Sequence, residues 1–169
     1  MYYTSDNGVF KLDAYNGTPR IAGMPKGLGG TVALSASTPV WMPTNEQVAY
    51  RVVWGYEDSN QNLILGAPSE RLVLTNPDPA TVPGSVTKSV SLDIQIPDGI
   101  LTTDFYQVYR SGLSSDEDIE PNDNMGLVYE DNPTSGEITA GNIVIPDITP
   151  DDLRGADLYT SVEGIGQSN

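Results

Sequence analysis

The fold of this chain is decided by the stretch Val48-Ala49-Tyr50-Arg51-Val52-Val53-Trp54-Gly55-Tyr56. Large apolar or aromatic side chains stand at every even position of this stretch, and a mixed set stands between them. A period of two is typical of a β-strand, and β-branched and aromatic residues favour that structure. We therefore expect a strand whose even positions face a hydrophobic core, with Trp54 inside the core.

The segments on either side also have strand and turn patterns. Residues 58–62 predict a hairpin turn rather than a calcium loop, because Leu63 and Ser69 stand where the EF-hand needs glycine and glutamate. The chain then returns through 63–65, kinks at 66–69 and resumes at 71–74. Further strands are expected at 31–37, 90–96, 105–110, 126–129 and 142–145. Residues 149–153 resemble a single helical turn with Thr149 as its N-cap.

These patterns predict an all-β protein. We expect a β-hairpin with a glycine-rich linker over residues 1–30, a β-sandwich over 31–148 and a return segment over 149–169. Residues 50–58 followed by 66–69 resemble the closing two strands of a fibronectin type III domain, and 89–99 with 106–111 resemble its second and third strands. Because the late-strand features come first, the chain has either a permuted immunoglobulin-like sandwich or a likeness confined to the strand pattern.

The composition excludes several classes of function. The chain of 169 residues carries a formal net charge of −15, with no histidine and no cysteine. Such acidity argues against binding to nucleic acids or to anionic membranes, both of which need clustered lysine and arginine. Without histidine or cysteine there is no Ser-His-Asp triad, no thiolate nucleophile and no ordinary zinc site. Paired carboxylates for glycoside hydrolysis remain, but nearly all acids fall in loops, so we expect no enzyme and no cofactor.

Two features of the sequence could bind a ligand, and each also has a simpler structural explanation. Asp116, Asp118, Glu120 and Asp123 lie in an acidic loop that could chelate Ca²⁺ weakly, although charged runs are more often solvated surface. Trp41 lies in a proline-flanked loop and is the candidate for an exposed contact, with capping of one end of the sandwich as the favoured interpretation.

The two ends of the chain nearly repeat each other. Residues 3–9, Tyr-Thr-Ser-Asp-Asn-Gly-Val, are matched by residues 159–165, Tyr-Thr-Ser-Val-Glu-Gly-Ile. Each copy has an aromatic start, a glycine turn and a return to a β-branched residue. We interpret the pair as the two sides of a sheet scaffold into which the sandwich is inserted, and the chain as a fragment of a longer polypeptide.

This layout resembles the nozzle, or tail-tubular, protein of short-tailed bacteriophages. The resemblance rests on the blade-like hairpin of residues 3–12, the exit at 22–25 and the segments 158–161, 163–165 and 167–169. It implies a non-enzymatic structural protein of the virion tail, found in the host cytoplasm during assembly. The implied partners are other tail subunits in a homo-oligomeric ring, with no nucleic acid and no membrane. The alternative is a carbohydrate- or receptor-binding sandwich module.

Overall fold

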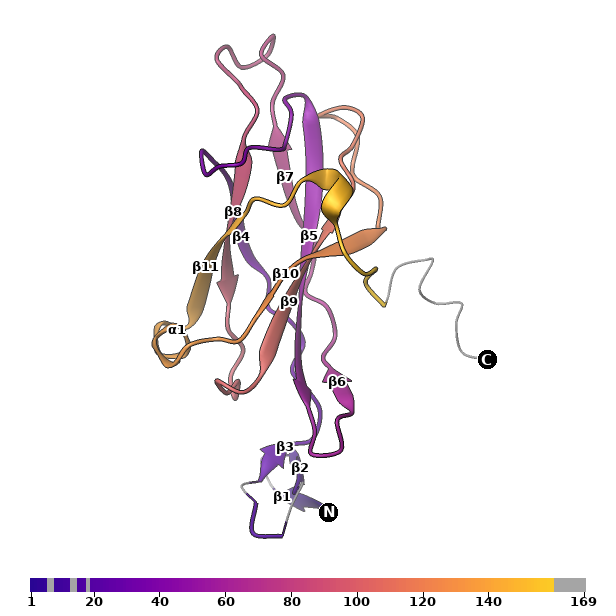
Figure 1. Cartoon of the computed structure of the whole chain (residues 1–169), viewed down its shortest axis with the longest axis vertical. Coiled ribbons are helices and arrows are strands. Elements are labelled where there is room, and N and C mark those ends of the chain that lie inside the picture. Colours follow the sequence, from indigo (N-terminus) through magenta and orange to yellow (C-terminus); the bar gives the residue numbers. More distant parts are fainter. Residues whose placement is uncertain (6–7, 13–14, 18, 160–169) are drawn as a thin grey trace, which may run out of the picture.

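The structure is a computed structural model, and it describes residues 1–5, 8–12, 15–17 and 19–159. Within these residues it contains strands β1 to β11, a short α-helix, α1, and a 3-10 helix, η1. Figure 1 shows two facing sheets and a small third sheet beyond one end of them. The expected all-β sandwich with a flanking hairpin is therefore confirmed. No helix in the described part of the chain is long and apolar enough to cross a membrane.

Strand β5 (Glu46–Glu57) is the longest strand and runs through the middle of the larger sheet. Its even positions face the other sheet, as the alternation predicted, and Trp54 has no exposed surface. On the opposite face, Ala49 and Val53 are also fully buried. The alternation did not predict this second buried face, because the segment that covers it comes from the far end of the chain.

The larger sheet has the order β10-β9-β5-β6, and β7 also pairs with β5. Its other strands are β9 (Phe105–Ser111), β10 (Met125–Asp131), β6 (Leu63–Leu65) and β7 (Leu72–Asn76). Both β6 and β7 pair with β5, so they are two parts of one edge, and the predicted kink between them is confirmed.

At this kink the Ser69 hydroxyl replaces a strand partner. The Val52 N–H donates to Ser69 Oγ at 3.0 Å, and the Ser69 N–H donates to the Val52 carbonyl at 2.9 Å. The backbone of β5 therefore stays hydrogen-bonded across the break, as a buried strand requires.

The smaller sheet has the order β11-β8-β4 and consists of β4 (Gly30–Ser35), β8 (Ser89–Gln95) and β11 (Asn142–Asp147). Alternate residues of β8 point toward the larger sheet, and these residues have no exposed surface: Val90, Leu92 and Ile94. The chain passes from β4 to the larger sheet at β5, returns at β8 and crosses twice more before β11 ends. Strands that are distant in sequence are thus neighbours within each sheet.

The small sheet has the order β1-β2-β3, with β1 (Tyr2–Ser5), β2 (Gly8–Lys11) and β3 (Arg20–Ile21). The predicted hairpin is confirmed by the antiparallel pairing of β1 with β2. Two ion pairs hold this sheet against the sandwich, Lys11 with Asp58 at 2.9 Å and Arg20 with Asp104. The Arg20 guanidinium also lies 4.0 Å from the ring centre of Tyr56.

The connector of residues 23–30 packs along the sandwich and is hydrogen-bonded to it. The Gly27 N–H donates to the Ala67 carbonyl, and the Gly29 carbonyl accepts from the Gln95 N–H, both at 2.9 Å. A Cβ at Gly27 would collide with the Val52 carbonyl, so only glycine allows this close approach.

The two short helices differ from the sequence expectation. The 3-10 helix η1 (Asp151–Leu153) is preceded by Pro150, and the N-cap predicted at Thr149 is wrong. The Thr149 hydroxyl instead donates to the Val128 carbonyl. The helix α1 (Ser135–Ala140) was not expected, because none of its residues is buried and six residues are too few to show a helical period.

The segment after η1 crosses the outer face of the larger sheet. Leu158 is 1 % exposed and packs in a second apolar cluster with Ala49, Val53, Tyr109 and Met125. Its N–H donates to the Met125 carbonyl at 2.8 Å, so the segment is also held by its backbone. The second copy of the end-to-end repeat lies outside the described residues, apart from Tyr159.

We predict that Leu158→Ala lowers the free energy of unfolding by about 2–5 kcal/mol, because it leaves a cavity in a fully buried cluster. Urea denaturation measures this change. Leu153→Ala, in the preceding 3-10 helix, is the matched control, since Leu153 is 66 % exposed, and it should change stability by less than about 0.5 kcal/mol. Equal effects of the two substitutions would contradict the placement of Leu158.

Candidate functional site

A buried ion pair joins the two sheets near one end of the sandwich. Arg110, from β9, and Asp147, from β11, meet at 2.7 Å between Nη1 and Oδ2, with side chains 0 % and 1 % exposed. The same Oδ2 accepts a hydrogen bond from the Tyr50 hydroxyl at 2.8 Å. Burial, with Asp147 as the next cause, raises the pKa of Tyr50 well above its usual value. Tyr50 therefore remains a hydrogen-bond donor to this carboxylate.

Trp41 belongs to this buried cluster. The Arg110 guanidinium lies 3.6 Å from the centre of the Trp41 ring, and Trp41 Nε1 donates to the Asp147 carbonyl at 2.8 Å. The indole is half-buried rather than exposed, because Arg110 covers one of its faces and the core packs against it. The capping position that the sequence favoured for Trp41 agrees with this placement.

Within the described part of the chain, two other nitrogen atoms of the Arg110 guanidinium lack a close hydrogen-bond partner. Arg110 Nη2 lies 3.6 Å from Asp151 Oδ1, and Arg110 Nε and Nη2 have no hydrogen-bond partner among the described atoms. Nearby, burial and then the charge of Asp151 raise the pKa of Glu46. A buried cation paired with Asp147 and covered by an indole makes this a structural cluster that fixes the two sheets, and we do not interpret it as a ligand site.

The acidic loop lies elsewhere, and its carboxylates are divided among different partners. Arg71 lies 3.3 Å from Asp123 and 4.0 Å from Glu120, and Asp116 accepts the N–H of Asp118 at 2.9 Å. Among the described residues, no three or more acidic, histidine or cysteine side chains are grouped so that they could hold a metal ion. The structure thus does not gather the four predicted calcium ligands around one point.

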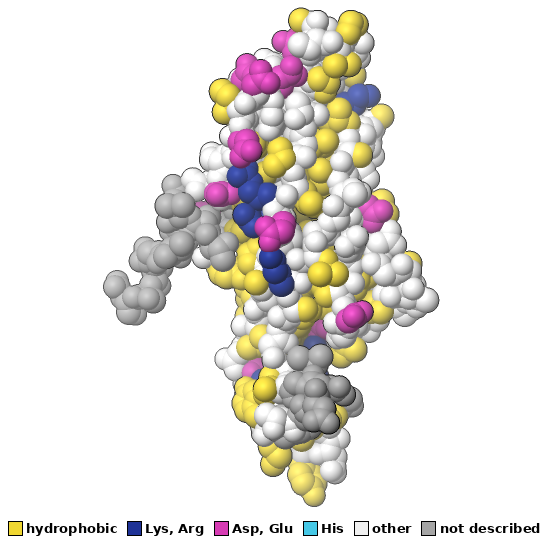
Figure 2. Space-filling view, turned by 180° about the vertical axis from the view of Figure 1, so that it is seen from behind, with side chains coloured by type: hydrophobic (Ala, Val, Ile, Leu, Met, Phe, Trp, Pro, Cys, Tyr) yellow, Lys and Arg dark blue, Asp and Glu magenta, His cyan; other side chains and the backbone are white. Residues whose placement is uncertain are grey.

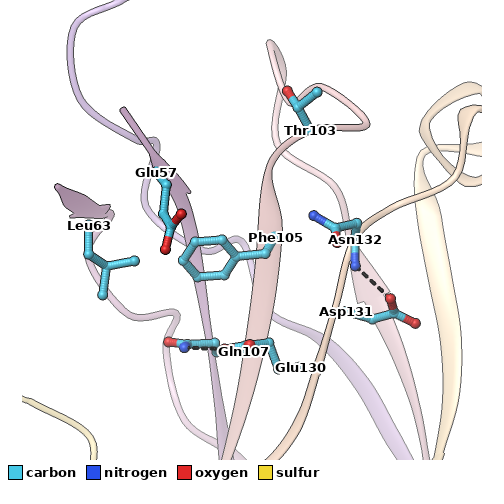
Figure 3. Close-up of a pocket in the computed structure, with 8 residues that line it drawn as sticks. All are labelled: Glu57, Leu63, Thr103, Phe105, Gln107, Glu130, Asp131 and Asn132. Carbon is cyan, nitrogen blue, oxygen red and sulfur yellow. Dashed lines mark hydrogen bonds between the residues drawn. The ribbon is translucent and has the colours of Figure 1, made fainter. Parts of the chain in front are cut away.

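The outer face of the larger sheet contains a cavity of about 530 Å³ that the sequence analysis missed (Figure 3). Its centre is the half-buried ring of Phe105, at the start of β9. Phe105 pairs directly with Gly55 of β5, and a Cβ at Gly55 would collide with its ring. The cavity is lined by Glu57, Leu63, Thr103, Phe105, Gln107, Glu130, Asp131 and Asn132.

A second cavity, of about 510 Å³, lies between the small sheet and the sandwich. Its walls are mainly apolar and include Phe10, Met24 and Leu101, with the Arg20–Asp104 ion pair at its edge. This ion pair holds the small sheet against the sandwich. We therefore interpret the cavity as a gap left by incomplete packing between the small sheet and the sandwich.

The sequence contained an unused indication of the buried ion pair. Tyr106, Val108 and Arg110 share one face of β9, and Ile143, Ile145 and Asp147 share one face of β11. A charge at the third inward position of each strand predicts either a buried pair or a strand end. The cavity had no such indication, because it needs the pairing of Gly55 with Phe105, which are distant in sequence.

The fold and its cavities define the chain as an all-β, two-sheet sandwich protein with an attached three-stranded sheet. Comparisons with protein-family models, with curated proteins and with solved structures found no match.

We predict that Asp147→Asn lowers the free energy of unfolding by about 3 kcal/mol, because it leaves the Arg110 charge buried without its closest partner. Adding Arg110→Met to this variant removes the unpaired charge and should restore most of the stability. Chemical denaturation measures both changes. Asp118→Asn on the exposed loop is the matched control and should be nearly neutral. A double variant as unstable as the single one would contradict this account.

Proposed function

We propose that this chain is a non-enzymatic structural component of the tail of a short-tailed bacteriophage, in the nozzle or tail-tube wall. In this proposal the sandwich is a fibronectin type III-like domain inserted into a β-scaffold to which the small sheet belongs. The subunits form a homo-oligomeric ring with other tail proteins in the virion, after assembly in the host cytoplasm.

One observation carries the inserted-domain part of the proposal: the entry and the exit of the sandwich meet at Gly66. On the entry side, a Cβ at Gly66 would collide with the Pro25 carbonyl. On the exit side, the Tyr159 hydroxyl donates to the Gly66 carbonyl at 2.7 Å. Neighbouring entry and exit points are what the insertion of one domain into another requires.

The strand order supports a permuted fibronectin-like sandwich. In the family, the third strand lies beside the last two in one sheet. Here β9, which resembles the third strand in sequence, lies beside β5, which resembles the first of the closing pair. Strand β8, with the second-strand resemblance, lies in the opposite sheet. A permuted fibronectin-like sandwich, in which the late strands come early in the chain, would have this arrangement, which supports the proposal.

The surface charge is consistent with a channel wall that does not retain DNA. In the part of the chain that the structure describes, six of the eight basic side chains form ion pairs with carboxylates. Figure 2 shows a short row of basic side chains on one face, with acidic side chains beside it. With a net charge of −15, such a surface repels phosphates rather than binding them.

The alternative function, a carbohydrate- or receptor-binding module, has less support at Trp41. Trp41 is half-buried and stacked on Arg110, so it offers a sugar no free aromatic platform. A glycan array tests this alternative directly, and saturable binding that Trp41→Ala abolishes would favour it over the structural role.

We predict that the purified chain does not retard duplex DNA on a native gel at physiological salt, because most of its basic side chains are held in ion pairs and its net charge is negative. Retardation that weakens as salt rises would contradict this prediction.

The tail location has a direct test. Immunogold labelling with antibodies against the purified chain should mark the tails of short-tailed particles whose genome encodes it. Label confined to capsids or to the host envelope would contradict the tail role, as would particles without any label. Label at the tail together with binding on the glycan array would favour an adhesive tail component over a tube wall.

A further inference from the structure

The cavity around Phe105 lies on the part of the outer face of the larger sheet that the described residues leave open. The other part of this face is covered by Leu158 and its neighbours. The cover approaches β9 at Tyr109, which belongs to the Leu158 cluster, whereas Gln107 and Phe105 line the cavity. The cavity is thus a hollow on the outer face of the larger sheet, next to the area that Leu158 covers.

The floor of the cavity offers an aromatic ring to a ligand. Phe105 lies over Gly55, so no side chain of β5 separates its ring from the sheet. Figure 3 shows the carboxylate of Glu57 beside this ring, and the Gln107 side chain joined to that of Glu130 below it.

Each side-chain amide of the cavity already gives one of its two N–H groups to the protein. Gln107 Nε2 donates to Glu130 Oε2 at 2.5 Å, and Gln107 Oε1 accepts from the Tyr109 hydroxyl at 2.9 Å. Burial, with the charge of Glu130 as the next cause, raises the pKa of Tyr109 to about 12, so this hydroxyl remains a donor. Asn132 Nδ2 donates away from the cavity, to the Asp104 carbonyl at 2.7 Å.

The cavity therefore offers a ligand mainly acceptors. Its lining includes the carboxylates of Glu57, Glu130 and Asp131, and no lysine or arginine lies among the lining residues. A sugar hydroxyl needs both donors and acceptors from its site. Ammonium and guanidinium groups are donors only, and they are also attracted to the face of an aromatic ring.

We propose that this cavity binds an ammonium or guanidinium group, presented by a lysine or arginine side chain of a partner protein. The acidic loop of residues 116–123 lacks this combination, because it has no aromatic floor and Arg71 neutralises part of its charge. The net charge of −15 adds long-range attraction for a basic partner, and this attraction weakens with salt. The proposal does not depend on the tail role.

The experiment is a titration of the isotope-labelled chain, followed by NMR, with acetylated and amidated Gly-Lys-Gly and Gly-Arg-Gly peptides. Amide signals of Phe105, Gln107 and residues 130–132 should shift saturably, with a dissociation constant on the order of millimolar, because one partly exposed cation is bound. Matched peptides with norleucine or citrulline keep the shape and remove the charge, and they should cause no saturable shift.

Two variants separate a specific site from general acidity. Glu57→Gln should weaken binding about threefold or more, and Phe105→Leu should weaken it similarly while leaving an apolar floor. Glu120→Gln changes the net charge by the same amount on the acidic loop and should leave binding unchanged. Equal weakening by Glu57→Gln and Glu120→Gln would overturn the proposal, as would equal binding of the norleucine peptide.

The amide spectrum of each variant reports whether the fold is retained, so loss of binding is separated from unfolding. Absence of shifts up to tens of millimolar of both basic peptides would also overturn the proposal. Shifts of the same signals with a neutral saccharide, but not with the basic peptides, would assign the cavity to carbohydrate instead.

Discussion

The rest of the structure depends on one constraint, which is that β5 is buried on both faces and paired along both edges. Its inner face fills the space between the sheets, and its outer face carries Ala49 and Val53 under Leu158. Such a strand cannot leave a backbone group unpaired without a large cost. Where the neighbouring edge breaks, the Ser69 hydroxyl accepts the hydrogen bond of the Val52 N–H, so β5 stays hydrogen-bonded across the kink.

Small residues around the kink then determine how the remaining chain is arranged. Gly27 and Gly66 allow the connector to approach β5 and its edge more closely than any side chain would permit. The exit segment reaches the same place through Tyr159. The described part of this segment covers only part of the outer face. The cavity around Phe105 lies beside the covered part, and a third glycine, Gly55, makes room for the Phe105 ring at its floor.

Features that depend on local pattern could be predicted from the sequence, and features that depend on distant partners could not. The alternation in β5 and β8, the kink at 66–69 and the first hairpin follow from neighbouring residues. The second buried face of β5 needs Leu158, about a hundred residues away along the chain. The helix α1 is capped by the Thr134–Glu137 pair but buries nothing, so only its capping box could have revealed it.

The distribution of charge links the two proposals. Most basic side chains are held in ion pairs, and one of them, Arg110, is fully buried. The chain therefore has few cations free to gather phosphates, and many of its carboxylates must face water or a partner. On most of the surface these carboxylates are solvated and attract cations only weakly. Around Phe105 the carboxylates border an aromatic ring in a hollow, and a bound cation would be attracted both by the carboxylates and by the face of the ring. The same negative charge that repels DNA therefore favours a basic partner at this cavity.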